Sequence, residues 1–265
     1  MDKIKVGIVS LGLIGSSILK GLYKKYEVYC YSMTLPQDAF NYSKNVSNNL
    51  DDLKVCDIVF VCSPISKTLE MLQKLDKILN PETVVCDCAS VKGELLNQKF
   101  NFDFVLSHPM AGSEKSGFSA GCAELFKGAK WLIEKNNSIL EKIIEDLGAK
   151  SIVIDMKNHD YMCAQISHMP SILAYALFDT TEDSSKQIAS SGFRDMTRLA
   201  MSDSVLISDM FKYNRENVIK AFDELIEKIN SLKKLKDNEK INLFEKIKKQ
   251  RTQMYDEFGN NIFKI

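Results

Sequence analysis

The sequence lacks a net charge and any long hydrophobic run. Lysine plus arginine and aspartate plus glutamate each number 35, so no overall field draws the protein to nucleic acid or to an anionic membrane. The apolar runs have the length of strands, and residues 1–6 lack the apolar stretch of a secretory signal. We therefore expect a cytoplasmic protein that binds neither nucleic acid nor a membrane.

Arginine and histidine are also scarce, with four arginines against 31 lysines and only three histidines. A guanidinium binds a carboxylate through two parallel hydrogen bonds, and an imidazole titrates near neutral pH. The choice of residues for binding an anion or accepting a proton is therefore small. Two of the four arginines, Arg194 and Arg198, lie within one short segment.

The seven cysteines are an odd number and do not form a complete disulfide framework. Four of them lie in predicted core strands or just after one: Cys30, Cys62, Cys86 and Cys88. Buried thiols of this kind are typical of a reduced, cytoplasmic protein. No second ligand pair with zinc-like spacing accompanies Cys86 and Cys88, so we predict no metal site.

Residues up to 154 alternate between short β-rich runs and amphipathic segments, and 265 residues can bury a substantial core. The predicted strands are 4–9, 28–31, 57–62, 83–86, 104–106, 131–133 and 152–154, and the main predicted helices are 13–25, 66–79 and 138–147. Alternation of strand and helix predicts a mostly parallel sheet covered on both faces. We expect this α/β domain to span residues 1–155.

After Asp155 the strand pattern stops, and we expect an all-helical domain over residues 156–265. Two apolar stripes have the three-to-four spacing of helices that bury one face. The first contains Phe211, Val218, Phe222, Leu225, Ile229 and Leu232, and the second contains Phe244, Ile247, Met254 and Phe258. About 110 helical residues have limited means to bury both stripes alone, so we predict a homodimer. The basic stretch 228–251 has no motif for binding nucleic acid. We therefore interpret it as a helix face exposed to solvent.

Residues 10–15 form a glycine-rich turn between the first strand and a helix. The segment Ser10-Leu11-Gly12-Leu13-Ile14-Gly15 matches G-x-G-x-x-G with serine at the first glycine. In this context the motif favours a dinucleotide, because backbone N–H groups at the helix start bind its pyrophosphate. A tight turn with close helix–strand packing is the alternative, and it explains Gly15 better than Gly12.

The end of the second strand carries Ser32 where NAD enzymes place an acid that binds the ribose. A neutral hydroxyl does not repel a 2′-phosphate, so Ser32 slightly favours NADP over NAD. No arginine lies nearby to clamp the phosphate.

Two further strand ends point to the same edge of the sheet, where ligands bind in such folds. Residues 62–64, Cys62-Ser63-Pro64, end one strand, and Ala89 and Ser90 follow the next. We expect residues 62–64 and Ala89 to contact the cofactor. Two interpretations of the serine remain open: a hydrogen bond from Ser90 to the substrate or to a catalytic histidine, or a cap by Ser90 or Ala89 on a helix that begins near Val91.

The segment 107–117, Ser-His-Pro-Met-Ala-Gly-Ser-Glu-Lys-Ser-Gly, places a histidine, a proline and two glycines in a predicted loop after a short strand. Loops on a rigid scaffold position reacting groups. A lone His108 would otherwise more often be a surface or core residue.

Five segments together resemble the prephenate/arogenate dehydrogenase family, and they occur in the order of that family. They are Gly-Leu-Ile-Gly (12–15), Ala-Ser-Val-Lys (89–92), the segment 108–117, Ile-Ser-His-Met-Pro (166–170) and Gly-Phe-Arg-Asp-Met-Thr-Arg (192–198). The resemblance implies a Rossmann-like domain, an all-α dimerisation domain and an active site between them. It also implies oxidative decarboxylation of prephenate or arogenate in tyrosine biosynthesis, with reduction of NAD or NADP.

The resemblance assigns roles to individual residues. His108 matches the catalytic histidine, with Ser90 in support, and His168 matches a second active-site histidine, for which a buried structural histidine is the rival interpretation. Arg194 matches the arginine that binds a substrate carboxylate. Ser171 stands where many members have another histidine, and His159 lies outside any motif, so we interpret it as a linker residue.

Glu114 and Lys115, within the signature segment, are further candidates for the substrate site. A surface ion pair that contributes little is the alternative for these two residues.

Two other functions compete with this interpretation. A related dehydrogenase acting on a β-hydroxyacid needs a catalytic lysine in the helical domain and does not predict the segment 108–117. A non-catalytic dinucleotide sensor explains Ser10 and Ser32 as loss of function, but it leaves the histidines and Arg194 without a purpose.

Overall fold

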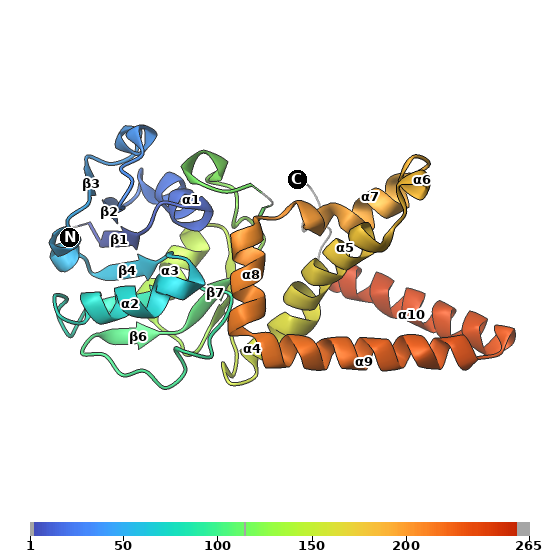
Figure 1. The fold of residues 1–265 in the computed structure, drawn as a ribbon. Coiled ribbons are helices and arrows are strands. Elements are labelled where there is room, and N and C mark those ends of the chain that lie inside the picture. Colours follow the sequence, from blue (N-terminus) through green and yellow to red (C-terminus); the bar gives the residue numbers. More distant parts are fainter. Residues whose placement is uncertain (1–2, 114, 259–265) are drawn as a thin grey trace.

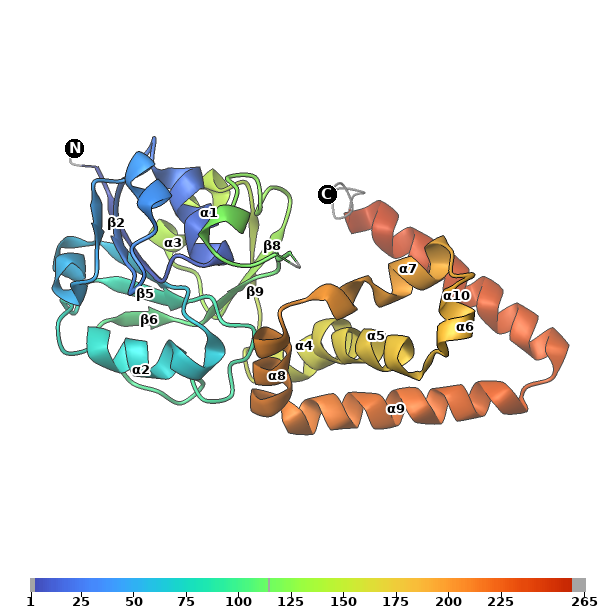
Figure 2. The same cartoon turned by 45° about the horizontal axis from the view of Figure 1, so that its top comes forward.

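The computed structural model describes residues 3–113 and 115–258, which form an α/β domain and a helical domain side by side (Figure 1). Helix α8 (Ser204–Tyr213) lies at the border between them in both ribbon views (Figures 1 and 2). This two-part architecture confirms the fold class predicted from the alternation of strands and helices.

Six strands form a fully parallel sheet in the order β3-β2-β1-β4-β5-β6. The strands are β1 (Lys5–Val9), β2 (Glu27–Tyr31), β3 (Asn45–Ser47), β4 (Ile58–Val61), β5 (Val84–Asp87) and β6 (Asp103–Val105). The chain leaves the centre of the sheet towards one edge and returns on the other side of β1, as in Rossmann folds. The three-residue strand β3 was not predicted, since it is too short to show an alternating pattern.

Helices cover both faces of this sheet (Figure 2). On one face, α1 (Leu13–Leu22) and α3 (Ser138–Asp146) pack against Val6 and Ile8 of β1. On the other face, α2 (Ile65–Leu75) packs against Val59 and Val61 of β4. Strand side chains alternate between the two faces, so two apolar cores form, one on each side of the sheet. The three predicted helices of this domain are confirmed.

A second sheet contains β7 (Ser107–Pro109), β8 (Lys130–Ile133) and β9 (Lys150–Val153). β7 runs antiparallel to β8, and His108 lies opposite Leu132. The prediction that a loop begins at residue 107 is therefore wrong for residues 107–109. Three residues that include a proline carry no strand signal of their own, and the pairing partner comes later in the chain. His108 consequently sits on a strand of fixed register.

The helical domain begins with one long, irregular helix. Its parts are α4 (His159–Cys163), a π-helical segment (Ala164–His168) and α5 (Met169–Thr180). Pro170 accounts for the irregularity, because it lacks an N–H group and its ring crowds the carbonyl four residues earlier. His168 therefore lies at a local distortion of the helix, a place where functional residues often occur.

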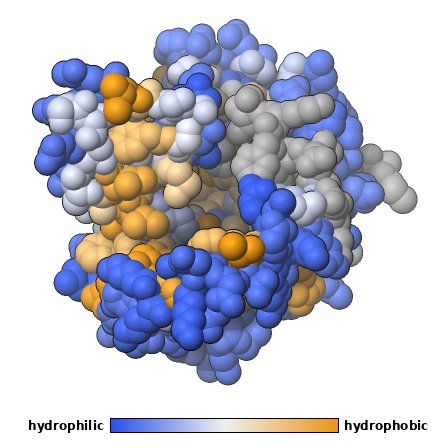
Figure 3. Space-filling view, turned by 90° about the vertical axis from the view of Figure 1, so that its right-hand side faces the viewer, coloured by the Kyte–Doolittle hydropathy of each residue, from blue (hydrophilic) through white to orange (hydrophobic). Residues whose placement is uncertain are grey.

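The remaining helices are α6 (Asp183–Lys186), α7 (Ser191–Thr197), α8, α9 (Arg215–Lys234) and α10 (Asp237–Phe258). Val218 of the first predicted stripe is buried with Ala221 and Ala164, and Phe211 and Phe222 of the stripe pack partly buried against this cluster. Three residues of the second stripe are exposed, with Phe244 52%, Ile247 45% and Met254 45% accessible, and the side chain of the fourth, Phe258, lies outside the described part. Viewed from this end, apolar side chains gather in a hollowed band rimmed by hydrophilic residues (Figure 3). Within the described part of the chain, no helix is long and apolar enough to cross a membrane.

Candidate active site

The turn between β1 and α1 is tightly packed at Gly15 and open at Gly12. Ser10 adopts a left-handed conformation with φ 75°, and its N–H donates to the Tyr31 carbonyl at 2.8 Å. A Cβ on Gly15 would lie 2.0 Å from the Ser10 carbonyl oxygen, so only glycine allows this packing, whereas a Cβ on Gly12 would meet nothing within 4 Å. Gly12 is the N-cap of α1 and offers no side-chain cap, which leaves the helix start open to a ligand. Packing therefore requires glycine at position 15, whereas the space in front of Gly12 is open and could admit a phosphate.

The other predicted cofactor residues follow strands whose carboxyl ends share this edge. Ser32 is buried, and its N–H donates to the Ser47 carbonyl at 3.0 Å. Ser63 and Pro64 join β4 to α2, with Pro64 as the N-cap of α2. The Cys62 sulfur lies 3.7 Å from that of Cys88, and neither cysteine is in a disulfide. A dinucleotide across this edge fits the residues present.

A fully buried network orders the strand that carries His108. The Lys92 ammonium pairs with the Asp87 carboxylate and donates to the Ser107 carbonyl at 2.5 Å. The Ser107 N–H donates to Asp87 Oδ1 at 3.0 Å, and Trp131 Nε1 donates to the Ser107 hydroxyl at 3.1 Å. The N–H, carbonyl and hydroxyl groups of Ser107 thus each have a partner, and the residue before His108 is held in place. Lys92 belongs to the recognised Ala-Ser-Val-Lys segment, but its role was not predicted.

Ser90 lies in a segment without the predicted helix. The expectation that Ser90 or Ala89 caps a helix near Val91 is wrong, since residues 93–97 form turns. The Asp160 carboxylate instead accepts the N–H groups of Lys92 at 2.7 Å and Gly93 at 2.8 Å. The Ser90 hydroxyl is buried and has no hydrogen-bond partner within residues 3–113 and 115–258. It is available to a ligand.

His108 forms a hydrogen-bonded chain with two residues of α4. Its Nδ1 lies 2.9 Å from Nε2 of His159, whose Nδ1 lies 2.7 Å from Oδ1 of Asp160. Burial, together with the nearby Lys92 charge and His159, holds the pKa of His108 well below its ordinary value of 6.5. His108 is therefore neutral near pH 7 and able to accept a proton.

The interpretation of His159 as a linker residue is wrong, because its side chain is completely buried in α4. A histidine next to an aspartate, nine positions before His168, was the only available signal. Because no family motif surrounds them, His159 and Asp160 could be interpreted either as a buried functional pair or as polar residues that join two domains.

Cys163 lies close to His108 and His159, and residues of these three types can bind a metal ion. Its sulfur lies 3.4 Å from His159 Nε2 and 3.8 Å from His108 Nδ1, so three ligand atoms cluster within 4.8 Å. Two nitrogens bound tetrahedrally to one zinc ion lie roughly 3.3–3.4 Å apart, given zinc–nitrogen bonds of about 2.0–2.1 Å. The observed 2.9 Å between the imidazole nitrogens is instead a hydrogen-bond distance.

His168 is completely buried at the end of the π-helical segment. Its Nδ1 lies 3.0 Å from the side-chain nitrogen of Asn214, whereas its Nε2 has no partner among the described residues. Burial lowers the pKa of His168 to about 4, against an opposing effect of the Asp160 charge. Sequence reasoning missed Asn214, a single residue between α8 and α9 with no motif around it.

Arg194 does not approach the histidines within one chain. Its side chain is 78% exposed on α7, and its Nε donates to Asp195 Oδ1 at 3.2 Å. The neighbouring Phe193 stacks on Phe178, ten residues beyond His168 and so about 15 Å further along the helix. Figure 1 shows α7 well to the right of β7 and beyond α8. Lys115 is exposed, and Glu114 lies outside the described residues.

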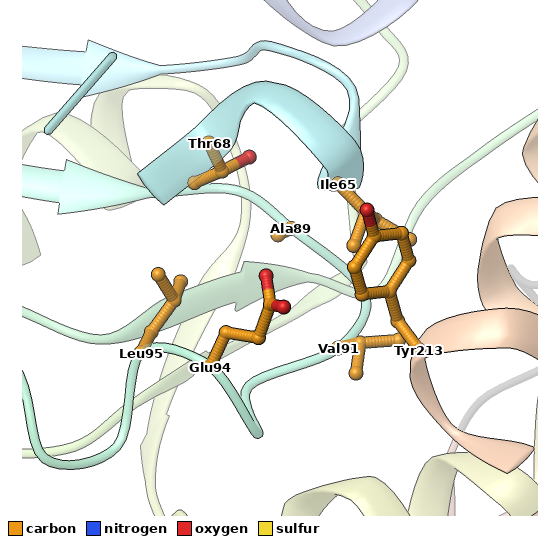
Figure 4. A pocket seen from close by; sticks show the side chains of 7 residues that line it. All are labelled: Ile65, Thr68, Ala89, Val91, Glu94, Leu95 and Tyr213. Atoms are coloured by element: carbon orange, nitrogen blue, oxygen red, sulfur yellow. The ribbon is translucent and has the colours of Figure 1, made fainter. Parts of the chain in front are cut away.

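A small hollow lies beside the 89–91 segment, between α2 and Tyr213 of α8 (Figure 4). It is lined by Ile65, Thr68, Ala89, Val91, Glu94, Leu95 and Tyr213. Its volume of about 10 Å³ is at the lower bound for a single water molecule. It cannot hold a cofactor or a ring-shaped substrate, and its apolar residues serve as a contact between the two domains.

Known proteins resemble the chain over nearly its whole length. Residues 37–153 match the family model of the prephenate dehydrogenase nucleotide-binding domain, and residues 155–250 match that of the dimerization domain. The prephenate dehydrogenase of Lactococcus lactis is 33% identical, over 94% of this chain and 77% of that protein.

Two solved structures share the fold of this chain at a sequence identity of 26% or 27%. The A. aeolicus prephenate dehydrogenase, in complex with hydroxyphenyl propionate and NAD+, is 27% identical with a TM-score of 0.84, covering 96% of this chain and 99% of the other. The Synechocystis arogenate dehydrogenase is 26% identical with a TM-score of 0.79, covering 95% and 100%. Together with the family models, these matches show that the chain belongs to the prephenate dehydrogenase family.

Proposed function

We propose that this protein oxidatively decarboxylates prephenate or arogenate to 4-hydroxyphenylpyruvate or tyrosine in tyrosine biosynthesis, with reduction of NAD(P). One observation carries the proposal. The two buried side-chain polar atoms left without a partner in the described chain, Ser90 Oγ and His168 Nε2, belong to the two residues that the family motifs place around His108. Unpaired buried groups are costly, and a bound polar ligand removes that cost.

The reaction removes a hydride from the ring carbon that bears the hydroxyl and carbon dioxide from the opposite ring carbon. The ring becomes aromatic, and no net proton is released. NAD(P), when bound, supplies the hydride acceptor. His108 accepts a hydrogen bond from the substrate hydroxyl, and a proton held at its Nε2 can return to the same oxygen. Aromatisation of the substrate provides most of the driving force, so the protein contributes orientation and charge placement.

For the cofactor, residues 10–15 are proposed to hold the pyrophosphate, with Ser32 at the ribose and residues 62–64 and Ala89 along the dinucleotide. The open space at Gly12 and the uncapped start of α1 support this placement. A neutral, buried Ser32 favours NADP slightly, because no carboxylate stands there to repel a 2′-phosphate. We place the domain boundary after residue 155, since β9 ends at Val153 and α4 begins at His159.

For the substrate carboxylate, we propose that Arg194 acts in the active site of a second copy of the chain. Within one chain it points to solvent, about 15 Å along α5 from His168. A homodimer also covers the apolar residues of α10, including Phe244 and Ile247, which one chain leaves exposed. Cytoplasmic localisation remains part of the proposal, in line with seven free cysteines.

The proposal is tested with purified protein, prephenate and arogenate, each combined with NAD and with NADP. Reduced cofactor is followed by absorbance, and at least one combination is expected to turn over. His108→Asn should lower kcat by about 100-fold or more while the protein still binds the cofactor and unfolds as the wild type does. Cofactor binding without turnover of either substrate would favour a dinucleotide sensor instead. Unchanged turnover by the folded variant would remove His108 from its role.

A further inference from the structure

The hydrogen bonds around His108 and His168 differ in direction, and one residue organises both. The Asp160 carboxylate lies at the end of the chain that leads to His108, and the Asp160 carbonyl lies at the end of the chain that leads to His168. We propose that the two imidazoles are held in opposite tautomers, with His108 as an acceptor and His168 as a donor at Nε2. His159, Asp160 and Asn214 are then positioning residues. This inference rests on the proposed function only for its catalytic consequence.

On the acceptor side, the proton positions follow from Asp160. Its carboxylate receives two backbone N–H groups and can only accept, so the proton between it and His159 sits on His159 Nδ1. His159 Nε2 then has a lone pair and accepts the N–H of His108 Nδ1 at 2.9 Å. The Cys163 thiol, whose pKa burial raises to about 12, stays protonated, and its sulfur lies 3.4 Å from His159 Nε2. The Nε2 of His108 is left with a lone pair.

On the donor side, the Asn214 amide is oriented by its neighbours. The Asp160 carbonyl can only accept, so it faces the amide nitrogen of Asn214 at 2.7 Å. The amide oxygen accepts from Asn217 at 2.7 Å, which gives the same orientation. The second hydrogen on the Asn214 nitrogen points to His168 Nδ1 at 3.0 Å, so the proton of the neutral His168 ring is on Nε2.

The consequence is a pair of neutral imidazoles with complementary functions. His108 can accept from a substrate hydroxyl, while His168 can donate to a substrate oxygen such as a carboxylate or carbonyl. The unpartnered, buried Nε2 of His168 fits this donor function. Neither ring needs to change its protonation to bind substrate, because the protein has already selected the tautomers.

Nitrogen-15 NMR of the full-length protein labelled only in histidine tests the assignment directly, since the sequence has three histidines and all belong to this network. Near pH 7.5 we expect His108 and His159 protonated at Nδ1 and His168 protonated at Nε2. Asn214→Leu should release His168 into a mixture of tautomers and leave the other two unchanged. A His108 ring protonated at Nε2, or a His168 ring protonated at Nδ1, would overturn the inference. The spectra need no substrate, so this outcome is independent of whether prephenate or arogenate is turned over.

Kinetics separate positioning from a purely structural role. His159→Leu removes the acceptor for His108 and should lower kcat by on the order of 100-fold, with the KM for cofactor unchanged. His159→Gln keeps an amide oxygen able to accept from His108 and should recover most of that loss. Equal kcat in the two variants, both folded, would show that the hydrogen bond has no positioning role.

Discussion

Asp87 and Lys92 form an ion pair in which neither side chain is exposed to solvent. The pair also holds Ser107, the residue before His108, through the Lys92 bond to its carbonyl. Lys92→Met leaves the Asp87 carboxylate buried without its counter-charge. It should lower the free energy of unfolding by about 3–5 kcal/mol, measured by urea denaturation.

The matched control is Lys74→Met, which breaks the exposed pair with Glu70 on α2. Water screens that pair, so no measurable loss of stability is expected. Equal losses in the two variants would contradict the view that burial makes the Asp87–Lys92 pair important.

Ser10 occupies a left-handed backbone conformation, with φ 75°, that favours glycine. Ser10→Gly removes the clash between Cβ and the backbone, and we expect the free energy of unfolding to rise by about 0.5–1 kcal/mol. Ser151→Gly, in the middle of β9, is the control and should lower stability by a similar amount, because glycine weakens a strand. A loss of stability in Ser10→Gly would show that the serine hydroxyl stabilises the fold by more than the backbone strain at this position destabilises it.

His168 should make stability depend on pH. Its pKa is about 4 in the folded protein and 6.5 ordinarily, so below pH 6.5 the unfolded chain binds a proton that the folded chain does not. Its contribution is complete above pH 6.5 and is lost as the pH falls towards 4. Between pH 7.5 and 5.0, the wild type should lose about 2 kcal/mol more than His168→Gln in urea unfolding. Parallel losses would mean that the ring can be protonated in the folded state.

Ser32 should control the choice of cofactor. Ser32→Asp introduces a carboxylate at the end of β2, where it can accept from two ribose hydroxyls and repels a 2′-phosphate. We expect the ratio of kcat/KM for NADP to that for NAD to fall by at least about tenfold, which corresponds to about 1.4 kcal/mol of repulsion between the carboxylate and the 2′-phosphate. Ser47→Asp, on the neighbouring β3, serves as a charge control. An unchanged ratio in Ser32→Asp would show that the ribose does not bind beside Ser32.

Arg194 and His108 should complement each other between subunits. His108→Asn and Arg194→Ala are each expected to be nearly inactive alone. If Arg194 serves the second copy, a mixed dimer regenerates one intact site, and a 1:1 mixture after subunit exchange should recover about 25% of wild-type activity, because half of randomly paired dimers are mixed. No recovery from mixtures that demonstrably contain the mixed dimer would place Arg194 in the active site of its own chain.

Most of the α/β domain follows from local patterns in the sequence. All seven predicted strands are present, because buried strands between amphipathic helices carry a strong apolar signal. β7 escaped prediction, since its pairing with β8 depends on residues more than twenty positions away. The residues of the candidate site likewise fall into those that the sequence could indicate and those that it could not. His108, His168 and Ser90 lie in recognisable motifs, whereas His159 and Asn214 do not.

The sequence by itself determined the parallel sheet, the glycine-rich turn and the family motifs, because each depends on neighbouring residues along the chain. Only the tertiary structure decided how the motifs cooperate. His159 meets His108 across 51 positions, and Asn214 meets His168 across 46. The direction of a hydrogen bond between buried groups depends on every donor and acceptor packed around them, and that arrangement exists only once the two domains are in contact.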